Sequence, residues 1–274
     1  MSVQAAAPGA LAGALGRYRP LFLNLLRREV RQRYKGSVLG VLWTFIAPLT
    51  VLVAYSLVFH YLYRVVNVPD YALFALTGLV VWYFFAGAAV AASSSLIANA
   101  NLVRKVAFPR ALIPMSAVGG NAVTMLAMLA VLVPINLIVA PAARSPALVL
   151  LPVIVLLLIA MTYGFSLMIA GANVYFRDVE HILAALLLPW FFLTPIFYTP
   201  DSLPEGASSV QWLVNVLNWG NWVTPYVDVT RDVALNGVWP PANQMVFCVL
   251  VAAFFVVAGH LLFRRLEGEM AVEL

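Results

Sequence analysis

Charged residues are scarce in this chain. Of its 274 residues, 10% are Asp, Glu, Lys or Arg, and 64% are hydrophobic. An ordinary soluble domain is about one quarter charged and about half apolar, so this composition excludes one. Apolar runs of span length indicate transmembrane helices. The sequence therefore predicts an all-α integral membrane protein.

Acidic and strongly basic residues are missing from the apolar segments that could cross a membrane. These segments contain no Asp, Glu, Lys or Arg. Ion-coupled transporters and proton pumps usually keep an ionisable group at mid-membrane. The absence argues against both classes and suits a path for a large, mostly neutral, amphipathic cargo.

Several chemical motifs are also absent. The single cysteine, Cys248, lies in an apolar run, which excludes a disulfide within the chain and a cysteine metal site. Neither the G-x-x-x-x-G-K-[ST] phosphate loop nor the G-x-S-x-G elbow occurs. Asp178, Glu180 and His181 are interpreted as a solvated span end, not as a metal site. We therefore expect no catalytic residue, metal or cofactor in this chain, and a partner must supply any energy.

The apolar segments predict six transmembrane helices, since about 20 apolar residues are needed for each. Residues 1–16 are predicted to be a loose tail, and residues 264–274 a short charged tail. Residues 199–243 contain apolar pieces that are too short to cross, which predicts re-entrant helices between the fifth and sixth spans. The predicted spans cover residues 38–61, 71–97, 111–139, 147–170, 182–198 and 245–263.

A basic segment immediately precedes the first predicted span. Residues 17–35 show the periodicity of an amphipathic helix that lies in the membrane interface, with Arg27, Arg31 and Lys35 in one stripe. Glu29 and Arg33 are placed near the apolar face, four residues apart, where they could pair. The alternative is an ordinary basic anchor before a first span.

The distribution of cations predicts the orientation. The N-terminal segment, the second and fourth loops and the C-terminal tail together carry 13 Lys or Arg, whereas the other side carries only Arg64, Arg144 and Arg231. The positive-inside rule then places both termini in the cytoplasm and residues 199–243 outside. Because the cations lie at span ends, the pI of about 9.5 does not indicate nucleic-acid binding.

Aromatic residues are concentrated in the first and fifth predicted spans, where prolines interrupt the helices. Aromatic faces can stack on sugar rings while presenting little charge. The alternative is a lipid-facing aromatic belt combined with helix packing. The candidate channel-lining residues are Trp43, Phe45, Tyr55, Phe59, Phe191, Phe192, Phe197 and Tyr198.

Four stretches, in order, resemble a known family. They read RREVRQRYKGSVLGVLWTFIAP, VRKVAFPRALIP, NVYFRDVEHIL and PIFYTPDSLP. With the six-span layout, they make the chain resemble the transmembrane subunit of ABC-2 type polysaccharide exporters, which carry O-antigen, capsule or teichoic acid. The resemblance implies two copies around one channel, powered by two copies of a separate ATPase that binds ATP and magnesium.

The resemblance also implies roles for particular residues. Residues 99–110 would form a coupling helix in a groove of the ATPase, and residues 173–181 a second contact. Thr224-Pro225 departs from the Asn-Pro that the family often has before its second re-entrant helix. The implied ATPase-coupling residues are Val103, Arg104, Lys105, Phe108, Pro109, Arg110, Arg177 and Asp178, and the implied outer-gate residues are Trp212, Trp222, Pro225, Tyr226 and Arg231.

The expected function is ATP-driven export of a lipid-linked polysaccharide across the bacterial inner membrane. Clustered arginines suit phosphate, so the interface helix is expected near the lipid carrier's pyrophosphate, although anionic lipid alone would also explain the cations. The alternatives are an ABC-2 exporter of drugs or lipids, a glycan polymerase or ligase using Asp228, Arg231 and Asp232, and a passive channel. The candidate phosphate-binding cations are Arg27, Arg28, Arg31, Arg33 and Lys35.

Overall fold

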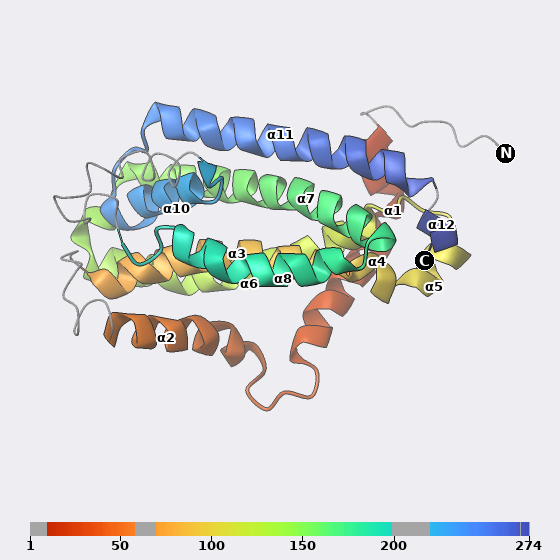
Figure 1. Ribbon diagram of the computed structural model, residues 1–274. Helices are drawn as coiled ribbons and strands as arrows, with labels where there is room; N and C mark the ends of the chain where they lie inside the picture. Colours follow the sequence, from red (N-terminus) through yellow and green to blue (C-terminus); the bar gives the residue numbers. More distant parts are fainter. Residues whose placement is uncertain (1–9, 58–69, 199–219, 269, 274) are drawn as a thin grey trace.

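Long, apolar, roughly parallel helices form the body of the protein (Figure 1). The computed structural model describes residues 10–57, 70–198, 220–268 and 270–273, and all regular elements within them are helical. Four helices are long and apolar enough to cross a membrane, which confirms the corresponding predicted spans. They are α3 (Tyr71–Ser93), α6 (Leu112–Val139), α7 (Leu151–Tyr175, preceded by the turn η4, Pro146–Leu150) and α11 (Ala242–Glu267).

Two further apolar helices are shorter. Helix α2 (Trp43–Tyr55) follows the turn η1 (Gly40–Leu42), and α8 covers Asp178–Leu193. Their 13 and 16 residues extend about 20 and 24 Å, less than the roughly 30 Å of a hydrocarbon core. Residues 58–61 lie outside the described residues, and the chain after α8 is extended because Pro195 disfavours a helical Thr194. The count of six spans therefore stays a prediction, and α8 ends before the predicted limit at residue 198.

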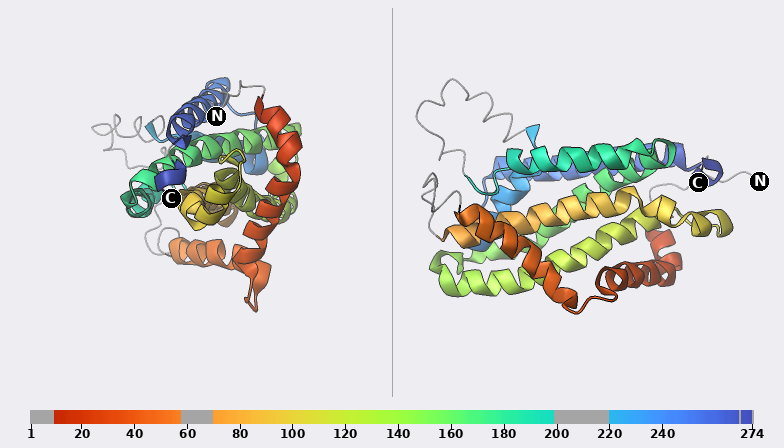
Figure 2. Two further views of the ribbon diagram at one scale, coloured as in Figure 1. Left: turned by 90° about the vertical axis from the view of Figure 1, so that its right-hand side faces the viewer. Right: turned by 60° about the horizontal axis from the view of Figure 1, so that its bottom comes forward.

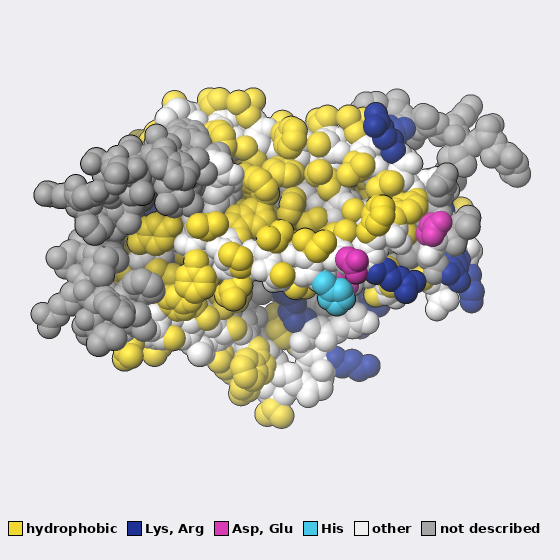
Figure 3. Space-filling view, in the orientation of Figure 1, with side chains coloured by type: hydrophobic (Ala, Val, Ile, Leu, Met, Phe, Trp, Pro, Cys, Tyr) yellow, Lys and Arg dark blue, Asp and Glu magenta, His cyan; other side chains and the backbone are white. Residues whose placement is uncertain are grey.

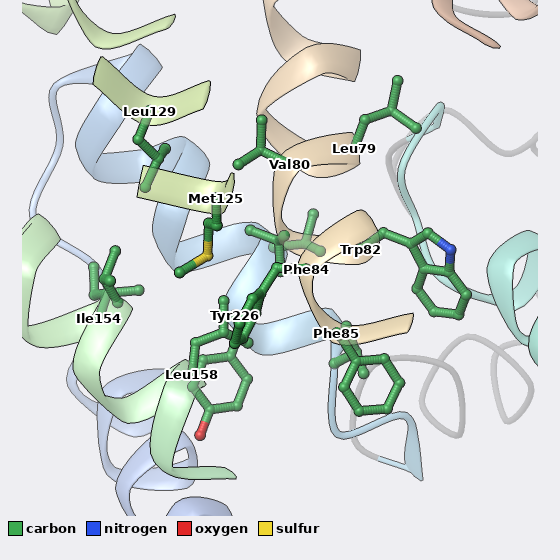
Figure 4. Packing of buried hydrophobic residues seen from close by; sticks show 14 of the residues in the cluster. Leu79, Val80, Trp82, Phe84, Phe85, Met125, Leu129, Ile154, Leu158 and Tyr226 are labelled. Carbon is green, nitrogen blue, oxygen red and sulfur yellow. The ribbon is translucent and has the colours of Figure 1, made fainter. Parts of the chain in front are cut away.

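Helix α3 is the interior helix of the bundle. In its most apolar window, 72% of the residues are buried, against 33%, 33% and 28% for α6, α7 and α11. Figure 4 shows Phe84 of α3 beside Met125 of α6 and Tyr226, whereas Trp82 points to the other side of α3, where its ring meets Trp190 and Phe191. The other three long helices leave wide apolar faces uncovered, as expected for surfaces that meet lipid or another membrane protein.

The backbones of helices α7 and α11 approach each other closely at two glycines, Gly164 and Gly259. A Cβ atom on Gly164 would lie 2.2 Å from the backbone carbonyl carbon of Phe255, and one on Gly259 would lie 2.1 Å from the carbonyl oxygen of Gly164. Small residues allow backbones to approach in this way in membrane helices. The two helices are therefore coupled through their backbones.

The remaining elements gather at the two ends of the bundle (Figures 1 and 2). We call the end with α1 (Ala10–Tyr34), α4 (Ser95–Ala98), α5 (Ala100–Lys105) and α12 (Met270–Glu273) the basic end. The opposite end carries the turn η3 (Pro141–Ala143), α10 (Thr224–Arg231) and the π-helical turn η8 (Asp232–Asn236). Figure 3 shows Lys and Arg side chains gathered toward the basic end, with an apolar belt along the bundle.

Helix α1 differs from the predicted interface helix at its start. It begins at Ala10, before the predicted start at residue 17, so residues 10–16 are helical and not part of a loose tail. The segment ALAGALG is rich in strong helix formers, which explains the extension. At its other end, Gly36 has φ +78°, a conformation that favours glycine and lets the chain turn toward α2.

Candidate functional site

Helix α1 lies against α6 and packs on it with its apolar side. Leu25 is buried, and Phe22 and Leu26 lie over Gly119. A Cβ atom at Gly119 would be 3.0 Å from Leu26, and one at Gly120 would be 3.2 Å from the Cβ of Glu29. The adjacent glycines thus provide the surface on which α1 packs, as expected of an amphipathic helix with a protein-covered face.

The predicted phosphate-binding cations fall into two groups. Arg28 donates to Asn99 Oδ1, and Arg33 donates to Asn121 Oδ1 at 2.7 Å and to Thr124 Oγ1 at 2.8 Å. The other three cations are exposed, and their side chains form no hydrogen bond or ion pair within the described residues. They are Arg27, Arg31 and Lys35.

The suggested pair of Glu29 and Arg33 is wrong. Glu29 lies 3.8 Å from Arg28, its neighbour along the chain. The long side chain of Arg33 instead reaches the amide and hydroxyl groups of α6, which sequence spacing along α1 does not reveal. Arg33 therefore fixes α1 to α6.

A cavity of about 490 Å³ opens where α1, α2, α3 and α6 meet. Arg33, Thr44 and Asn121 supply polar atoms to its wall, whereas Trp43 and Tyr83 supply aromatic rings. Trp43, a predicted channel-lining residue, is 52% exposed here. The cavity combines a cation, hydroxyls and apolar surface, which suits an amphipathic ligand with an anionic head.

The predicted coupling segment is helical over only half its length. Helix α5 ends at Lys105, and Val106 is extended, so the helix does not reach residue 110 as predicted. Pro109, which cannot donate a backbone hydrogen bond and disfavours a helical Phe108, prevents a helix from continuing to residue 110. The segment nevertheless separates its side chains clearly: Val103 and Phe108 are buried, Arg104 and Lys105 are exposed, and Pro109 and Arg110 are half-buried.

The predicted second contact lies at the start of α8. Arg177 and Asp178 are exposed, and Asp178 lies in the first turn of α8, where the helix dipole favours an acid. Asn173, buried at the end of α7, donates to the Ser93 carbonyl at 3.0 Å and accepts from the Glu180 N–H at 3.1 Å. In the sequence, only its place at the end of an apolar run marks Asn173, and nothing there indicates these two contacts.

Several of the predicted channel-lining aromatics meet between α2 and α8. Tyr55 stacks on Phe197, with ring centroids 4.3 Å apart, and contacts Phe191 at 5.9 Å and Phe192 at 6.0 Å. Phe192 is half-exposed, whereas Phe197 is buried. Phe45 and Tyr198 are partly buried against the core, and Phe59 lies outside the described residues.

Helix α10 carries three of the predicted gate residues into the interior. Pro225 and Tyr226 are buried, and the Tyr226 hydroxyl donates to the Cys248 carbonyl of α11 at 2.6 Å. Trp222 packs against Trp190, with centroids 4.8 Å apart. Trp212 lies outside the described residues. Pro225, Tyr226 and Trp222 are therefore packing residues in this structure, and their gate role stays a prediction.

Arg231 ties α10 to α3 and to the chain after α8. It donates to the carbonyls of Phe74 at 3.2 Å, Pro195 at 2.7 Å and Ile196 at 2.6 Å. Its guanidinium also lies 3.6 Å from the Phe74 ring centroid. A Cβ atom at Gly78 would lie 2.7 Å from Arg231 Nη2, so only glycine leaves room for it.

An acid accompanies this buried cation. Asp228, one turn earlier on α10, lies 3.9 Å from Arg231. Burial raises the pKa of the Asp228 carboxyl to about 6, although the Arg231 charge acts in the opposite direction. Since Arg231 is already held by three backbone carbonyls, it is poorly placed to serve with Asp228 and Asp232 in catalysis.

Asn221, which no sequence pattern predicts as a site residue, also joins elements at this end. Its side-chain oxygen accepts from Trp190 Nε1 at 2.9 Å and from the Val223 N–H at 3.1 Å, and its nitrogen donates to Thr194 Oγ1 at 2.8 Å. It thereby connects the end of α8 to the start of α10. Asn221 lies two residues before Val223, the N-cap of α10, so no capping pattern in the sequence indicates it.

Similarity to known proteins gives the family. The model of the ABC-2 type transporter family matches residues 20–235. The O-antigen export system permease protein RfbA of Myxococcus xanthus is 35% identical over 95% of this chain and 98% of its own length, and the protein of that name from Klebsiella pneumoniae is 29% identical over 94% and 96%. The polysialic acid transport protein KpsM of Escherichia coli is 24% identical over 90% and 93%. This chain belongs to the ABC-2 type transporter family of membrane proteins.

Proposed function

We propose that this chain is the membrane subunit of an ATP-driven exporter of a lipid-linked polysaccharide, resembling O-antigen, across the bacterial inner membrane. Two copies form the channel, and two separate ATPase subunits bind ATP with magnesium and supply the energy. The main support is the end-to-end similarity to permeases whose names state O-antigen export.

The basic end has the features of a docking site for the ATPase. Arg104 and Lys105 are exposed, whereas Val103 and Phe108 are buried. The segment therefore has charged side chains on its surface, and its apolar side chains attach it to the bundle. Arg177 and Asp178 offer a second exposed charged contact. In this proposal both contacts lie in the cytoplasm, consistent with the positive-inside rule.

The exposed stripe on α1 supports a lipid-linked cargo. Arg27, Arg31 and Lys35 are free to meet a phosphate, whereas Arg28 and Arg33 hold α1 in place. Planar guanidinium groups suit phosphate oxygens. The rings of Tyr55, Phe191 and Phe192 form an uncharged aromatic surface between α2 and α8, where sugar rings could slide.

Complementation of a strain that lacks this chain tests the proposal. In a strain that lacks this chain, surface polysaccharide should be lost and lipid-linked polymer should accumulate inside, and the wild-type chain should restore display. The double variant Arg104→Glu, Lys105→Glu should insert normally yet fail to restore display, because charge reversal disrupts docking. The matched control is Arg265→Glu, which reverses an exposed cation outside both predicted contacts.

Other results would contradict particular parts of the proposal. Normal display with the Arg104→Glu, Lys105→Glu chain would contradict the docking role. ATPase stimulation by small amphiphiles, and not by lipid-linked sugar, would indicate the drug or lipid exporter. Glycan synthesis by the purified chain without any ATPase would indicate an enzyme.

A further inference from the structure

The C-terminal segment folds back onto the bundle. Helix α11 continues to Glu267 at the basic end, and α12 (Met270–Glu273) follows after a turn. From the sequence, residues 264–274 are expected to be a tail. In the structure, α12 packs against α5, α7 and α11.

Glu267 meets the chain where the coupling segment enters α6. Its Oε1 accepts from the Arg110 backbone N–H at 3.1 Å, and its carbonyl oxygen accepts from Arg110 Nη1. The cap residue of α6, Ala111, has no side chain that could accept a hydrogen bond. A carboxylate beside the first turn of a helix also interacts favourably with the helix dipole. Glu267 therefore supplies a long-range acceptor beside the start of α6.

Leu266 and Met270, which flank Glu267 in the C-terminal segment, attach that segment to α7. The Tyr175 hydroxyl donates to the Leu266 carbonyl at 2.7 Å, and Leu266 and Met270 lie over Gly171. Met270 is fully buried in a cluster that also contains Val103 and Phe108 of the coupling segment. One short stretch of chain thus contacts the coupling segment on one side and α7 on the other.

We propose that Leu266, Glu267 and Met270 form a clamp that transmits movement of the coupling segment to α7 and α11, with Glu267 as a positioning residue that acts through Arg110. The proposal rests on the proposed function, since it concerns how ATPase movement reaches the membrane. Without the clamp, a push on α5 would reach α6 through the chain, while α7 and α11 would receive it only indirectly. With it, the backbone contact of Gly164 and Gly259 carries the push along both helices.

The test compares Glu267→Ala with Glu267→Gln in the assembled complex in liposomes. We expect Glu267→Ala to lower the polymer moved per ATP hydrolysed about fivefold, the factor that corresponds to losing one hydrogen bond. Glu267→Gln keeps an oxygen acceptor and should restore most of that ratio. Glu273→Ala, which removes an exposed acid from α12, is the matched control and should leave it unchanged.

Amide hydrogen exchange gives a second measurement that does not require transport. In the full complex, Glu267→Ala should accelerate exchange across residues 100–112 and leave α3 unaffected. If Glu267→Ala does not assemble, Arg110→Met removes the side-chain donor while keeping the backbone N–H, and it should show the same change in weaker form. Unchanged exchange, or an unchanged transport ratio in Glu267→Ala, overturns the clamp. If the wild-type complex moves no polymer, the proposed function fails and exchange alone decides the clamp.

Discussion

At the scale of single residues, the main result is that polar side chains in this apolar chain hold backbone segments together. Arg231 binds three carbonyls, Asn221 joins α8 to α10, and Asn173 joins α7 to α3 and α8. In a low-dielectric interior such groups are costly when unpaired and useful when fully bonded. Arg231, predicted as a gate residue, is thus first a structural tie.

The role of Arg231 as a tie can be measured by thermal unfolding in detergent. Arg231→Ala leaves buried carbonyls unpaired and should cost about 3 kcal/mol, which is a fall of roughly 5–10 °C in the unfolding midpoint. Arg231→Lys keeps the charge but loses the planar fork and should be nearly as destabilising.

Arg144 provides the matched control for that measurement. It also donates to a backbone carbonyl, that of Leu137 at 2.6 Å, but it is exposed. Arg144→Ala should therefore cost less than about 1 kcal/mol, because water replaces the lost bond. A full rescue by Arg231→Lys would show that charge, and not the three carbonyl bonds, is what matters at this position.

At the scale of helices, α1 has one face that packs on the protein and one face that is exposed and basic. Phe22, Leu25 and Leu26 face protein, whereas Arg27, Arg31 and Lys35 form an exposed stripe. The cations of α1 are therefore divided between packing contacts and the exposed stripe. Packing uses the apolar face with Arg28 and Arg33, and the stripe stays available for phosphate.

Neutralising the stripe should separate cargo binding from insertion. The triple variant Arg27→Gln, Arg31→Gln, Lys35→Gln should insert and assemble normally but reduce surface polysaccharide about tenfold, the effect of losing roughly 1.4 kcal/mol of phosphate binding. The control Arg19→Gln, Arg265→Gln removes exposed cations outside the stripe and should have little effect. Equal loss in both variants would assign the cations to anionic lipid, and full export by the triple variant would remove the phosphate role.

Sequence reasoning located the elements that depend on local composition. The helices α3, α6, α7 and α11 follow from apolar length, and the short basic helix α5 from its break between spans. Contacts between distant segments could not be read in the same way. Glu267 meets Arg110 across more than half of the chain, and no periodicity along either helix indicates that pair. The end of α8 was also misplaced, since Pro195 stops a helix that hydropathy alone would continue.

At the scale of the whole molecule, charge and packing divide the protein along its length. Helix α1 with its exposed cations, the coupling segment and the C-terminal clamp gather at the basic end, and the buried Arg231 lies at the opposite end (Figures 1 and 3). Between them, α3 is enclosed by protein, while α6, α7 and α11 keep uncovered apolar faces. This arrangement fits a subunit that receives a push at one end and transmits it along packed helices.

We expect the basic end to face the cytoplasm and the opposite end to face outward, and cysteine labelling can check this orientation. The natural Cys248 is 1% exposed, so it gives little background. Trp239→Cys places a thiol at an exposed position of the opposite end, and Arg104→Cys places one on the coupling segment. Because cations favour the cytoplasmic side, a membrane-impermeant maleimide should label only Trp239→Cys in intact spheroplasts and both variants after permeabilisation. Labelling of Arg104→Cys in intact spheroplasts would place the coupling segment outside the cell membrane, where a cytoplasmic ATPase subunit could not reach it.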